Sequence, residues 1–259
     1  MRMSDFGYRI AKLSCVPLRA KPSDTAEQVS QILAGEIVIV LSECEGNWFE
    51  VTCLYDGYKG FADPRHFSII TDLNSSERKV VNTPLSKWID PQTKRSITLP
   101  AGAILYSKFE GEYLGDKLIW GDVENPFGAS PYSIHEAALQ FLGAPYQWGG
   151  KTVLGIDCSG LSQIAARLVG VRLLRDASEQ AEQGESVEWG NRCVNDLAFF
   201  KNSEGKITHV GILISRDKII HASGEVRIDR LIEVGIIHSE SEKKTHQMSH
   251  LRRLPKQED

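Results

Sequence analysis

The chain has 259 residues, of which 41% are hydrophobic and 25% are charged, and these values are ordinary for a globular protein. Its 30 Lys and Arg residues against 34 Asp and Glu residues give a net charge of −4, which argues against a nucleic-acid partner because nucleic-acid binders need a basic excess. The sequence has no apolar run long enough to predict a membrane span, and residues 1–15 lack the unbroken apolar stretch of a signal peptide. The length allows one large domain or two to three small ones.

The cysteines form an odd set without a CxxC pair: Cys15, Cys44, Cys53, Cys158 and Cys193. This pattern argues against a zinc framework or a dense disulfide scaffold, and we expect neither a metal nor a cofactor. A reducing cytoplasm is the compartment that fits best. A periplasmic or secreted protein remains open if a signal peptide has been removed.

The first part of the chain, residues 1–72, is predicted to be a small β-barrel. Segments rich in β-branched and aromatic residues occur at 37–41, 48–51 and 58–61, with Pro, Gly, Asn and Asp between them. The polar residues 71–79 are predicted to be a linker.

A second β-rich unit is predicted over residues 78–128. Extended segments lie on either side of Pro100-Ala101-Gly102, in an order that resembles Leu33-Ala34-Gly35 and the strand that follows it. We therefore expect a second barrel related to the first.

Residues 130–259 are predicted to form an α+β domain. Ser133 is expected to cap a helix that runs to residue 141, and a second helix is expected from Cys158 to about residue 168. Strand-like segments follow at 197–200, 210–214, 218–221 and 226–228, and 251–254 could close a sheet. Helices followed by strands indicate the α+β class.

Cys158 is the candidate nucleophile. It lies at the predicted start of a helix, where the helix dipole and free N–H groups would favour a thiolate and lower the thiol pKa. The backbone N–H groups of Cys158 and Ser159 could also stabilise an oxyanion. The alternative is a buried structural cysteine.

His209 and His221 are the candidate partners of this cysteine. His209 lies 51 residues after Cys158, beside a predicted strand, and is the candidate base. If the two strands that carry the histidines pair as a hairpin, His221 can hydrogen-bond the second ring nitrogen of His209 and fix its tautomer. The alternative is a pair of structural histidines.

Six short motifs occur in this order: Pro145-Tyr146-Gln147-Trp148-Gly149-Gly150, Asp157-Cys158-Ser159-Gly160-Leu161, Arg175-Asp176-Ala177-Ser178-Glu179-Gln180, Asp196-Leu197-Ala198-Phe199-Phe200, Thr208-His209-Val210-Gly211-Ile212 and Ile220-His221-Ala222-Ser223-Gly224. Any one of them alone would be weak. Together they resemble the NlpC/P60 family of cysteine peptidases over about residues 130–255.

This resemblance implies a papain-like α+β catalytic core with Cys158 as nucleophile, His209 as base and His221 as the orienting third member. It also implies hydrolysis of the bond between γ-D-glutamate and a diamino acid in peptidoglycan stem peptides. The expected partner is therefore a peptide derived from the cell wall. The two N-terminal units resemble bacterial SH3 (SH3b) domains. Whether the diamino acid is diaminopimelate or lysine stays open.

The order of SH3b units before such a core resembles the YkfC-type branch, dipeptidyl-peptidase VI-like enzymes that need a free N-terminal L-alanine. In that branch the positions of Tyr146, Asp157 and Ser159 hold the substrate end. The Asp157 carboxylate is expected to pair with the α-ammonium group, and a helix N-cap is its alternative role. A Glu and a Tyr of the first SH3b domain close the amine pocket, and the candidates here are Glu27 and Tyr58.

The other histidines match no motif and are expected to be surface residues: His66, His135, His238, His246 and His250. Two further functions remain open from the sequence. A transacylase or amidase would use the same cysteine and histidine, and a non-catalytic protein would use the SH3b units to bind the cell wall.

Overall fold

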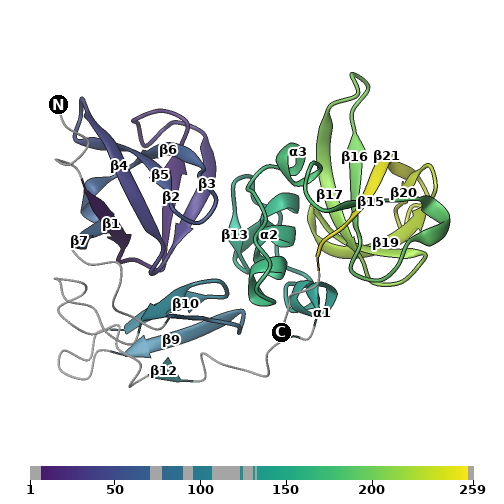
Figure 1. Cartoon of the computed structure of the whole chain (residues 1–259), viewed down its shortest axis with the longest axis horizontal. Coiled ribbons are helices and arrows are strands. Elements are labelled where there is room, and N and C mark those ends of the chain that lie inside the picture. Colours follow the sequence, from purple (N-terminus) through teal and green to yellow (C-terminus); the bar gives the residue numbers. More distant parts are fainter. Residues whose placement is uncertain are drawn as a thin grey trace. The chain divides into compact units, whose positions relative to one another are not determined.

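The computed structural model describes residues 7–70, 78–89, 96–106, 123–124, 131 and 133–255. The chain divides into two units, residues 1–129 and 130–259 (Figure 1). Among the described residues, no helix has the length and apolar character needed to cross a membrane.

The first unit begins with a seven-stranded antiparallel sheet in the order β3-β2-β6-β5-β4-β1-β7, which forms a small barrel. Its strands are β1 (Tyr8–Ala11), β2 (Cys15–Arg19), β3 (Gln28–Leu33), β4 (Ile37–Cys44), β5 (Trp48–Cys53), β6 (Lys59–Ala62) and β7 (Phe67–Ile70), and a 3₁₀ turn, η1 (Pro64–His66), precedes the last. Buried and half-buried residues alternate along β5, because successive side chains of a strand point to opposite faces. The three segments predicted from β-branched and aromatic residues correspond to β4, β5 and β6.

Five short strands follow in the same unit: β8 (Arg78–Val80), β9 (Leu85–Ile89), β10 (Ser96–Pro100), β11 (Ile104–Tyr106) and β12 (Val123–Glu124). They pair in the order β10-β9-β12 and as β11-β8. The predicted linker extended too far, since its last two residues already belong to β8. Much of the predicted second barrel lies outside the described residues, so that barrel stays a prediction.

The two Ala-Gly turns that suggested an internal repeat have the same backbone conformation. Gly35 has φ +79° and Gly102 has φ +89°, the left-handed region that glycine adopts without steric cost. A Cβ on Gly35 would lie 2.0 Å from the backbone oxygen of Ile104, and the Tyr106 hydroxyl donates to the Gly35 carbonyl at 2.8 Å. This contact ties the residues after β10 to the first barrel.

The second unit contains three helices: α1 (Ile134–Leu139), α2 (Cys158–Leu168) and α3 (Ala177–Gln180). Ser133 caps α1 by accepting from the Glu136 N–H at 3.5 Å, and the helix ends two residues before the predicted end. The predicted second helix is confirmed as α2. Most of its residues are buried, because it packs against the sheet on one side and α1 on the other.

The strands of this unit are β13 (Lys151–Thr152), β14 (Gly155–Ile156), β15 (Glu185–Val187), β16 (Leu197–Lys201), β17 (Ile207–Leu213), β18 (Lys218–Ser223), β19 (Glu225–Ile232), β20 (Gly235–Ile237) and β21 (Lys244–Arg253), with a 3₁₀ turn, η2 (Trp189–Asn191). The large sheet has the order β15-β21-β16-β17-β18-β19-β20, and β21 also pairs with β20, so the sheet closes on itself (Figure 1). Residues 251–253 do belong to a strand that closes the sheet, as predicted, but this strand, β21, begins seven residues earlier, at Lys244. The earlier part of β21 is polar and mostly exposed, so its composition does not show a strand.

Candidate active site

Cys158 is the first residue of α2. Asp157 is the N-cap residue of this helix, and its side chain accepts from the Gly160 N–H at 2.6 Å. The backbone N–H groups of Val210 and Ser159 face the Cys158 sulfur and act to lower its pKa. Since Val210 directly follows His209 on β17, the first residue of α2 and the strand that carries His209 are in contact.

The thiol of Cys158 nevertheless has a raised pKa in this structure. Burial and the nearby Asp157 carboxylate raise it to about 12, and together they outweigh the N–H groups of Val210 and Ser159 and the charge of Arg175. The expectation that the helix terminus would lower the thiol pKa is therefore wrong for the free protein. It neglected the burial of the sulfur, which sequence alone does not reveal.

Asp157 is part of a buried ion pair that supports the first turn of α2. Arg175 donates to both carboxylate oxygens, at 3.1 Å to Oδ1 and 2.6 Å to Oδ2, and only 1% of the Arg175 side chain is exposed. Gly149 N–H also donates to Oδ2, at 2.8 Å. The hydroxyl of Ser159 donates to Oδ1 at 3.3 Å and accepts from Arg175 at 2.8 Å. Asp157 is thus a helix cap whose negative charge is already balanced.

Two of the six sequence motifs support this turn. Gly149 has φ +72°, and a Cβ on Gly150 would lie 2.4 Å from the Gly155 carbonyl oxygen, so this turn can approach β14 only with glycine there. From the motif that contains Arg175, the Gln180 amide donates to the Ser159 carbonyl at 3.0 Å. Both motifs hold the residues around Cys158 in place.

Tyr146 lies close to the same residues. Burial raises its pKa to about 12, and the charges of Cys158 and Asp157 act in the same direction. The residue as a whole is 36% exposed. The structure therefore brings Tyr146, Asp157, Cys158 and Ser159 together.

His209 and His221 lie on neighbouring strands of the closed sheet. β17 and β18 are antiparallel with Ile212 opposite Ile220, which sets Gly211 opposite His221 and leaves His209 on the same face. A Cβ on Gly211 would lie 2.9 Å from the Cβ of His221, so glycine is required for the two strands to carry this pair. Nε2 of His209 and Nδ1 of His221 are 2.8 Å apart. The predicted contact between the two histidines is present.

The chain of hydrogen bonds continues to Asp229 on β19. Nε2 of His221 lies 3.0 Å from Oδ2 of Asp229, and both side chains are 1% exposed. Asp229 is in turn held by the backbone N–H and the hydroxyl of Ser239, each at 2.8 Å, and by Arg227 Nε at 3.1 Å. Although burial raises the pKa of this carboxyl, the hydrogen bonds from His221 and Ser239 outweigh burial and hold it well below its usual range.

His246 on β21 packs against His209. Its ring stacks on that of His209 with centroids 4.1 Å apart and an interplanar angle of 23°. Burial, followed by the neighbouring His246 and His221, holds the pKa of His209 well below its usual value. The expectation that His246 is a surface residue is wrong. It could not be corrected from sequence, because the polar β21 does not look like a strand.

The three rings of His209, His221 and His246 place nitrogen atoms within 4.8 Å of one another. A metal ion binds an imidazole nitrogen in the plane of the ring, and two nearly parallel stacked rings do not share such a point. The rings of His209 and His246 are stacked in this way. The arrangement therefore fits hydrogen bonding and stacking better than metal ligation.

The other histidines are half-buried rather than fully exposed: His66, His135, His238 and His250. His250 stacks on Phe199, and its Nε2 lies 3.1 Å from the Ala181 carbonyl oxygen. His135 Nδ1 lies 3.0 Å from Oδ1 of Asn195. These contacts are structural.

Glu27 and Tyr58 belong to the first unit. Glu27 is exposed and immediately precedes β3, and the half-buried Tyr58 immediately precedes β6 and packs on the barrel core. Cys158 belongs to the other unit, and the role of Glu27 and Tyr58 stays a prediction.

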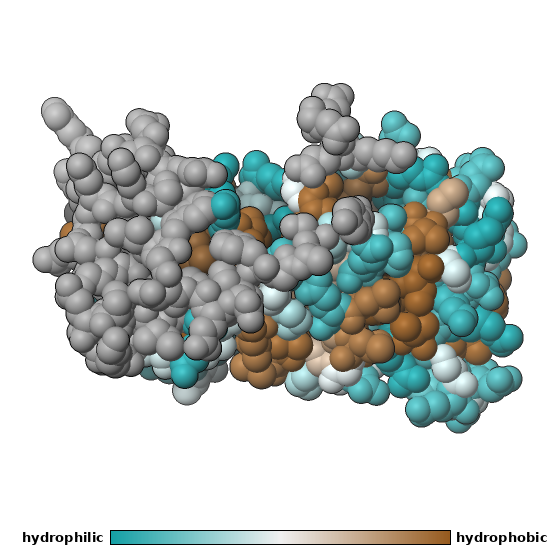
Figure 2. All heavy atoms as spheres, turned by 90° about the horizontal axis from the view of Figure 1, so that it is seen from below, coloured by the Kyte–Doolittle hydropathy of each residue, from teal (hydrophilic) through white to brown (hydrophobic). Residues whose placement is uncertain are grey.

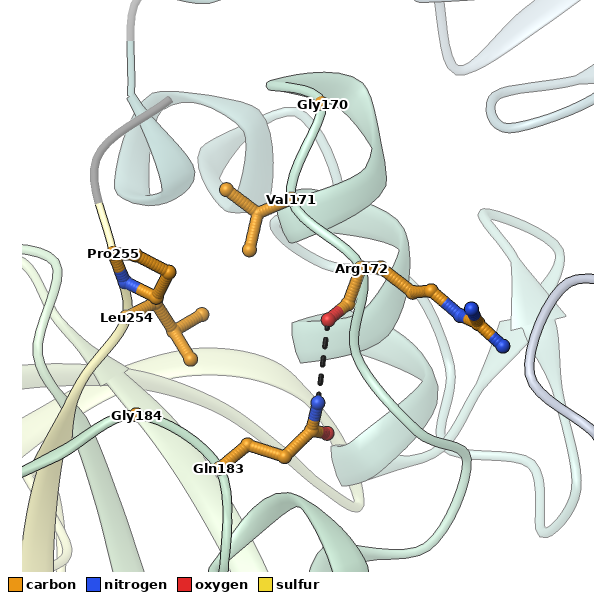
Figure 3. Close-up of a pocket in the computed structure, with 7 residues that line it drawn as sticks. All are labelled: Gly170, Val171, Arg172, Gln183, Gly184, Leu254 and Pro255. Atoms are coloured by element: carbon orange, nitrogen blue, oxygen red, sulfur yellow. Dashed lines mark hydrogen bonds between the residues drawn. The ribbon is translucent and has the colours of Figure 1, made fainter. Parts of the chain in front are cut away.

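A pocket of about 380 Å³ opens in the second unit at the end of α2 opposite Cys158 (Figure 3). It is lined by Gly170, Val171, Arg172, Gln183, Gly184, Leu254 and Pro255. Gln183 points toward the Arg172 carbonyl and donates to it at 3.3 Å. Because α2 has eleven residues, the pocket lies roughly 15 Å from Cys158 along the helix.

Figure 2 shows apolar side chains gathered in patches between hydrophilic ones on the surface of the second unit. Its exposed large apolar residues include Trp148 at 61% and Leu154 at 69%, both in the segment that leads to Asp157 and Cys158.

The model of the NlpC/P60 family matches residues 143–247, a range that includes Tyr146, Cys158, His209 and His221. The chain carries an NlpC/P60 domain. A bacterial dipeptidyl-peptidase SH3 domain matches residues 18–66. The NlpC/P60 domain makes this protein a hydrolase of peptidase type, and a cysteine nucleophile fits the family.

Two relatives are similar to most of this chain. Dipeptidyl-peptidase 6 of Lysinibacillus sphaericus is 29% identical over 83% of this chain and 89% of the relative. A γ-D-glutamyl-L-lysine dipeptidyl-peptidase of Bacillus subtilis is 27% identical over 74% of this chain and 71% of the relative. A crystal structure of an NlpC/P60 family protein from Bacillus cereus matches the fold with a TM-score of 0.77 at 20% identity, covering 96% of this chain and all of that one.

Three residues of the NlpC/P60 domain were not singled out from the sequence: Arg175, Asp229 and His246. Arg175 had a signal, since it stands in one of the six motifs. Asp229 had a weaker signal: it lies two residues before Leu231 and therefore on the same buried face of β19, where a carboxylate needs partners. His246 had none.

Proposed function

We propose that this protein is a cysteine peptidase that hydrolyses the γ-D-glutamyl–diamino acid bond of peptidoglycan stem peptides, with Cys158 as nucleophile. The proposal rests above all on the hydrogen bond of 2.8 Å between His209 and His221, beside a cysteine at a helix terminus. The names of the two relatives, a dipeptidyl-peptidase and a γ-D-glutamyl-L-lysine dipeptidyl-peptidase, support the substrate class.

The first half of the reaction is an acyl transfer to sulfur. Because Nε2 of His209 is engaged by His221, Nδ1 is the nitrogen that accepts the proton of Cys158. The resulting thiolate attacks the γ-carbonyl carbon, and the N–H groups at the start of α2 stabilise the oxyanion. His209 then gives its proton to the leaving amine of the diamino acid, and a thioester remains on Cys158.

The second half releases the acyl group. Water enters, His209 Nδ1 takes one proton from it, and the hydroxide attacks the thioester carbonyl. The C–S bond breaks, the Cys158 sulfur recovers the proton, and a peptide ending in γ-D-glutamate leaves. The raised pKa of Cys158 and the lowered pKa of His209 together favour a neutral thiol–imidazole pair before substrate binds. Proton transfer therefore belongs to the attack itself.

The proposal includes a preference for peptides with a free N-terminal L-alanine. Tyr146, Asp157 and Ser159 lie beside the nucleophile, where the residue before D-glutamate would bind. Because Arg175 already balances the charge of Asp157, a cationic amine needs a second carboxylate, and Glu27 is our candidate, with Tyr58 as a second residue of the amine pocket. Such a preference suits the recycling of released wall peptides, and we place this activity in the cytoplasm.

The first experiment compares Cys158→Ala with Cys193→Ala, which removes an exposed cysteine. The substrate is L-Ala-γ-D-Glu-L-Lys, with the diaminopimelate peptide in parallel, and products are separated by chromatography. We expect Cys158→Ala to abolish hydrolysis and Cys193→Ala to retain it. Hydrolysis by Cys158→Ala would contradict the assignment, and a new amide or ester in place of two peptides would indicate a transferase.

A second experiment tests the amine preference with the same tripeptide acetylated at its N-terminus. We expect kcat/KM to fall about tenfold or more, because a charge-assisted contact of the ammonium group is lost. Equal values for both peptides would reject the amine pocket while leaving the peptidase assignment intact.

A further inference from the structure

We propose that Asp229 is a positioning residue of the catalytic site, which sets the tautomers of His221 and His209 so that Nδ1 of His209 is the proton acceptor. The inference rests on the proposed function for its consequence in catalysis. The hydrogen-bond geometry that carries it is independent of the substrate.

The direction of the protons follows from the carboxylate. An ionised carboxylate only accepts hydrogen bonds, and the lowered pKa of Asp229 keeps it ionised. Nε2 of His221, at 3.0 Å from Oδ2, therefore carries a proton. When His221 is neutral its Nδ1 has a lone pair, so across the 2.8 Å contact Nε2 of His209 must be the donor.

This arrangement leaves the lone pair of neutral His209 on Nδ1. A base must present a lone pair to the proton that it removes, and the other tautomer would present an N–H to the nucleophile instead. Asp229 thus acts on Cys158 through two histidines without contacting the substrate. The imidazolium that forms on His209 during the reaction is also stabilised through this chain.

The contacts of Asp229 are specific for a carboxylate. Both oxygens accept: Oδ1 from the N–H and hydroxyl of Ser239, and Oδ2 from His221 and Arg227. An asparagine has one accepting oxygen, so its NH₂ group must face one of these donor sets. If it faces His221, Nε2 of His221 becomes an acceptor and its Nδ1 carries the proton. Nε2 of His209 then accepts, and Nδ1 of His209 carries the proton instead of the lone pair.

Among the described residues, no second carboxylate hydrogen-bonds His209 or His221. Facing the pair are Arg227 beside Asp229 on β19, His246 on β21 at 5.5 Å between ring centroids from His221, and Phe200 on β16 at 5.7 Å from the ring of His209. Burial, followed by the charge of His221, lowers the pKa of His246 to about 4, so this neighbour is neutral near pH 7.

The test uses the full chain labelled with ¹⁵N in histidine, together with its Asp229→Asn variant. Ring-nitrogen chemical shifts distinguish the two neutral tautomers, and His209→Gln assigns the signals of His209. We expect wild-type His209 to be protonated at Nε2 with Nδ1 bare, and the variant to lose this state. A wild-type His209 protonated at Nδ1 would overturn the proposal, even if the variant does not fold.

Reactivity gives the second readout. We expect Asp229→Asn to lower kcat for the tripeptide by about 10² or more with little change in KM, since Asp229 does not touch the substrate. Iodoacetamide alkylation of Cys158, followed by peptide mass spectrometry, should slow as well and needs no substrate. If the wild type cleaves no wall peptide, the proposed function fails while the tautomer and alkylation results still decide the role of Asp229.

Asp196→Asn is the matched control. Asp196 is equally buried in the same unit, and it accepts from Arg253 and the Cys193 N–H. We expect this variant to leave kcat, alkylation of Cys158 and the tautomer of His209 unchanged. An equal fall of kcat in both variants, with His209 unaltered in both, would reduce Asp229 to a structural residue and overturn the proposal.

Discussion

At the scale of single residues, the candidate active site is governed by burial of groups that would be charged in water. Cys158 and His209 are both buried. Burial raises the pKa of the thiol and lowers the pKa of the imidazole, so the neutral form of each group is favoured. A buried neutral pair avoids the desolvation cost of an ion pair in the free protein. The stacked ring of His246 belongs to the same environment, and it allows a prediction about acid stability.

Acid should destabilise the folded protein through His246. Its pKa is about 4 when folded, below the ordinary value of 6.5, so the unfolded chain binds more protons between these pH values. The free energy of unfolding should therefore fall as pH decreases from about 6.5 to about 4, with His209 acting in the same direction. We expect His246→Phe, which preserves stacking, to reduce this fall in urea unfolding at pH 7 and pH 5. His250→Phe, on the same strand and also stacked, should not.

At the scale of elements, the N-terminus of α2 is the organising feature. Three separate segments converge on its first turn: the glycine turn at 149–150, the Arg175 segment before α3, and β17 with Val210. The helix is buried along most of its length, so its first turn cannot shift without disturbing these contacts. The buried ion pair of Asp157 and Arg175 fixes the turn.

Asp157→Asn should be strongly destabilising although asparagine is also a good N-cap. The substitution leaves the Arg175 guanidinium, 1% exposed, without its counter-charge, and removing one partner of a buried pair costs about 3–5 kcal/mol. We expect a loss of about 3 kcal/mol in the free energy of unfolding, measured with urea. Glu204→Gln, which breaks the exposed ion pair with Lys206, should change it by less than about 1 kcal/mol. Equal effects would contradict the importance of the buried pair.

At the scale of the whole molecule, the chain combines a small β-barrel unit with an NlpC/P60 domain. All groups that we assign to bond cleavage lie in the second unit, whereas Glu27 and Tyr58 lie in the first. The proposed division of labour is that the second unit cleaves and the first selects peptides by their free amine. This division can be tested by a substitution far along the chain from Cys158.

Glu27→Gln should raise KM for the free tripeptide about tenfold, because the ammonium group loses a charged partner. The acetylated tripeptide should be unaffected, since it has no ammonium group. Glu45→Gln is the control, with the same charge change at another exposed glutamate of the first barrel. Steady-state kinetics on both peptides measures the effect, and an unchanged KM for the free peptide would remove Glu27 from the amine pocket.

The sequence by itself determined the residues that are local to a motif or an element. Asp157 and Cys158 stand at a helix start because small and capping residues precede an amphipathic run. The pairing of His209 with His221 follows from a hairpin, so strand periodicity was sufficient to predict it.

Only the tertiary structure decided the features that depend on contacts between distant segments. The raised pKa of Cys158 results from burial, and the helix terminus alone suggested the opposite sign. Arg175 forms an ion pair with Asp157, and Asp229 hydrogen-bonds His221 of the histidine pair. His246 stacks on His209 from β21, a strand that its polar composition does not predict. The burial of Cys158 and the contacts of these three side chains depend on how distant segments pack together. A local sequence pattern carries information about its own segment, not about the segments that pack against it.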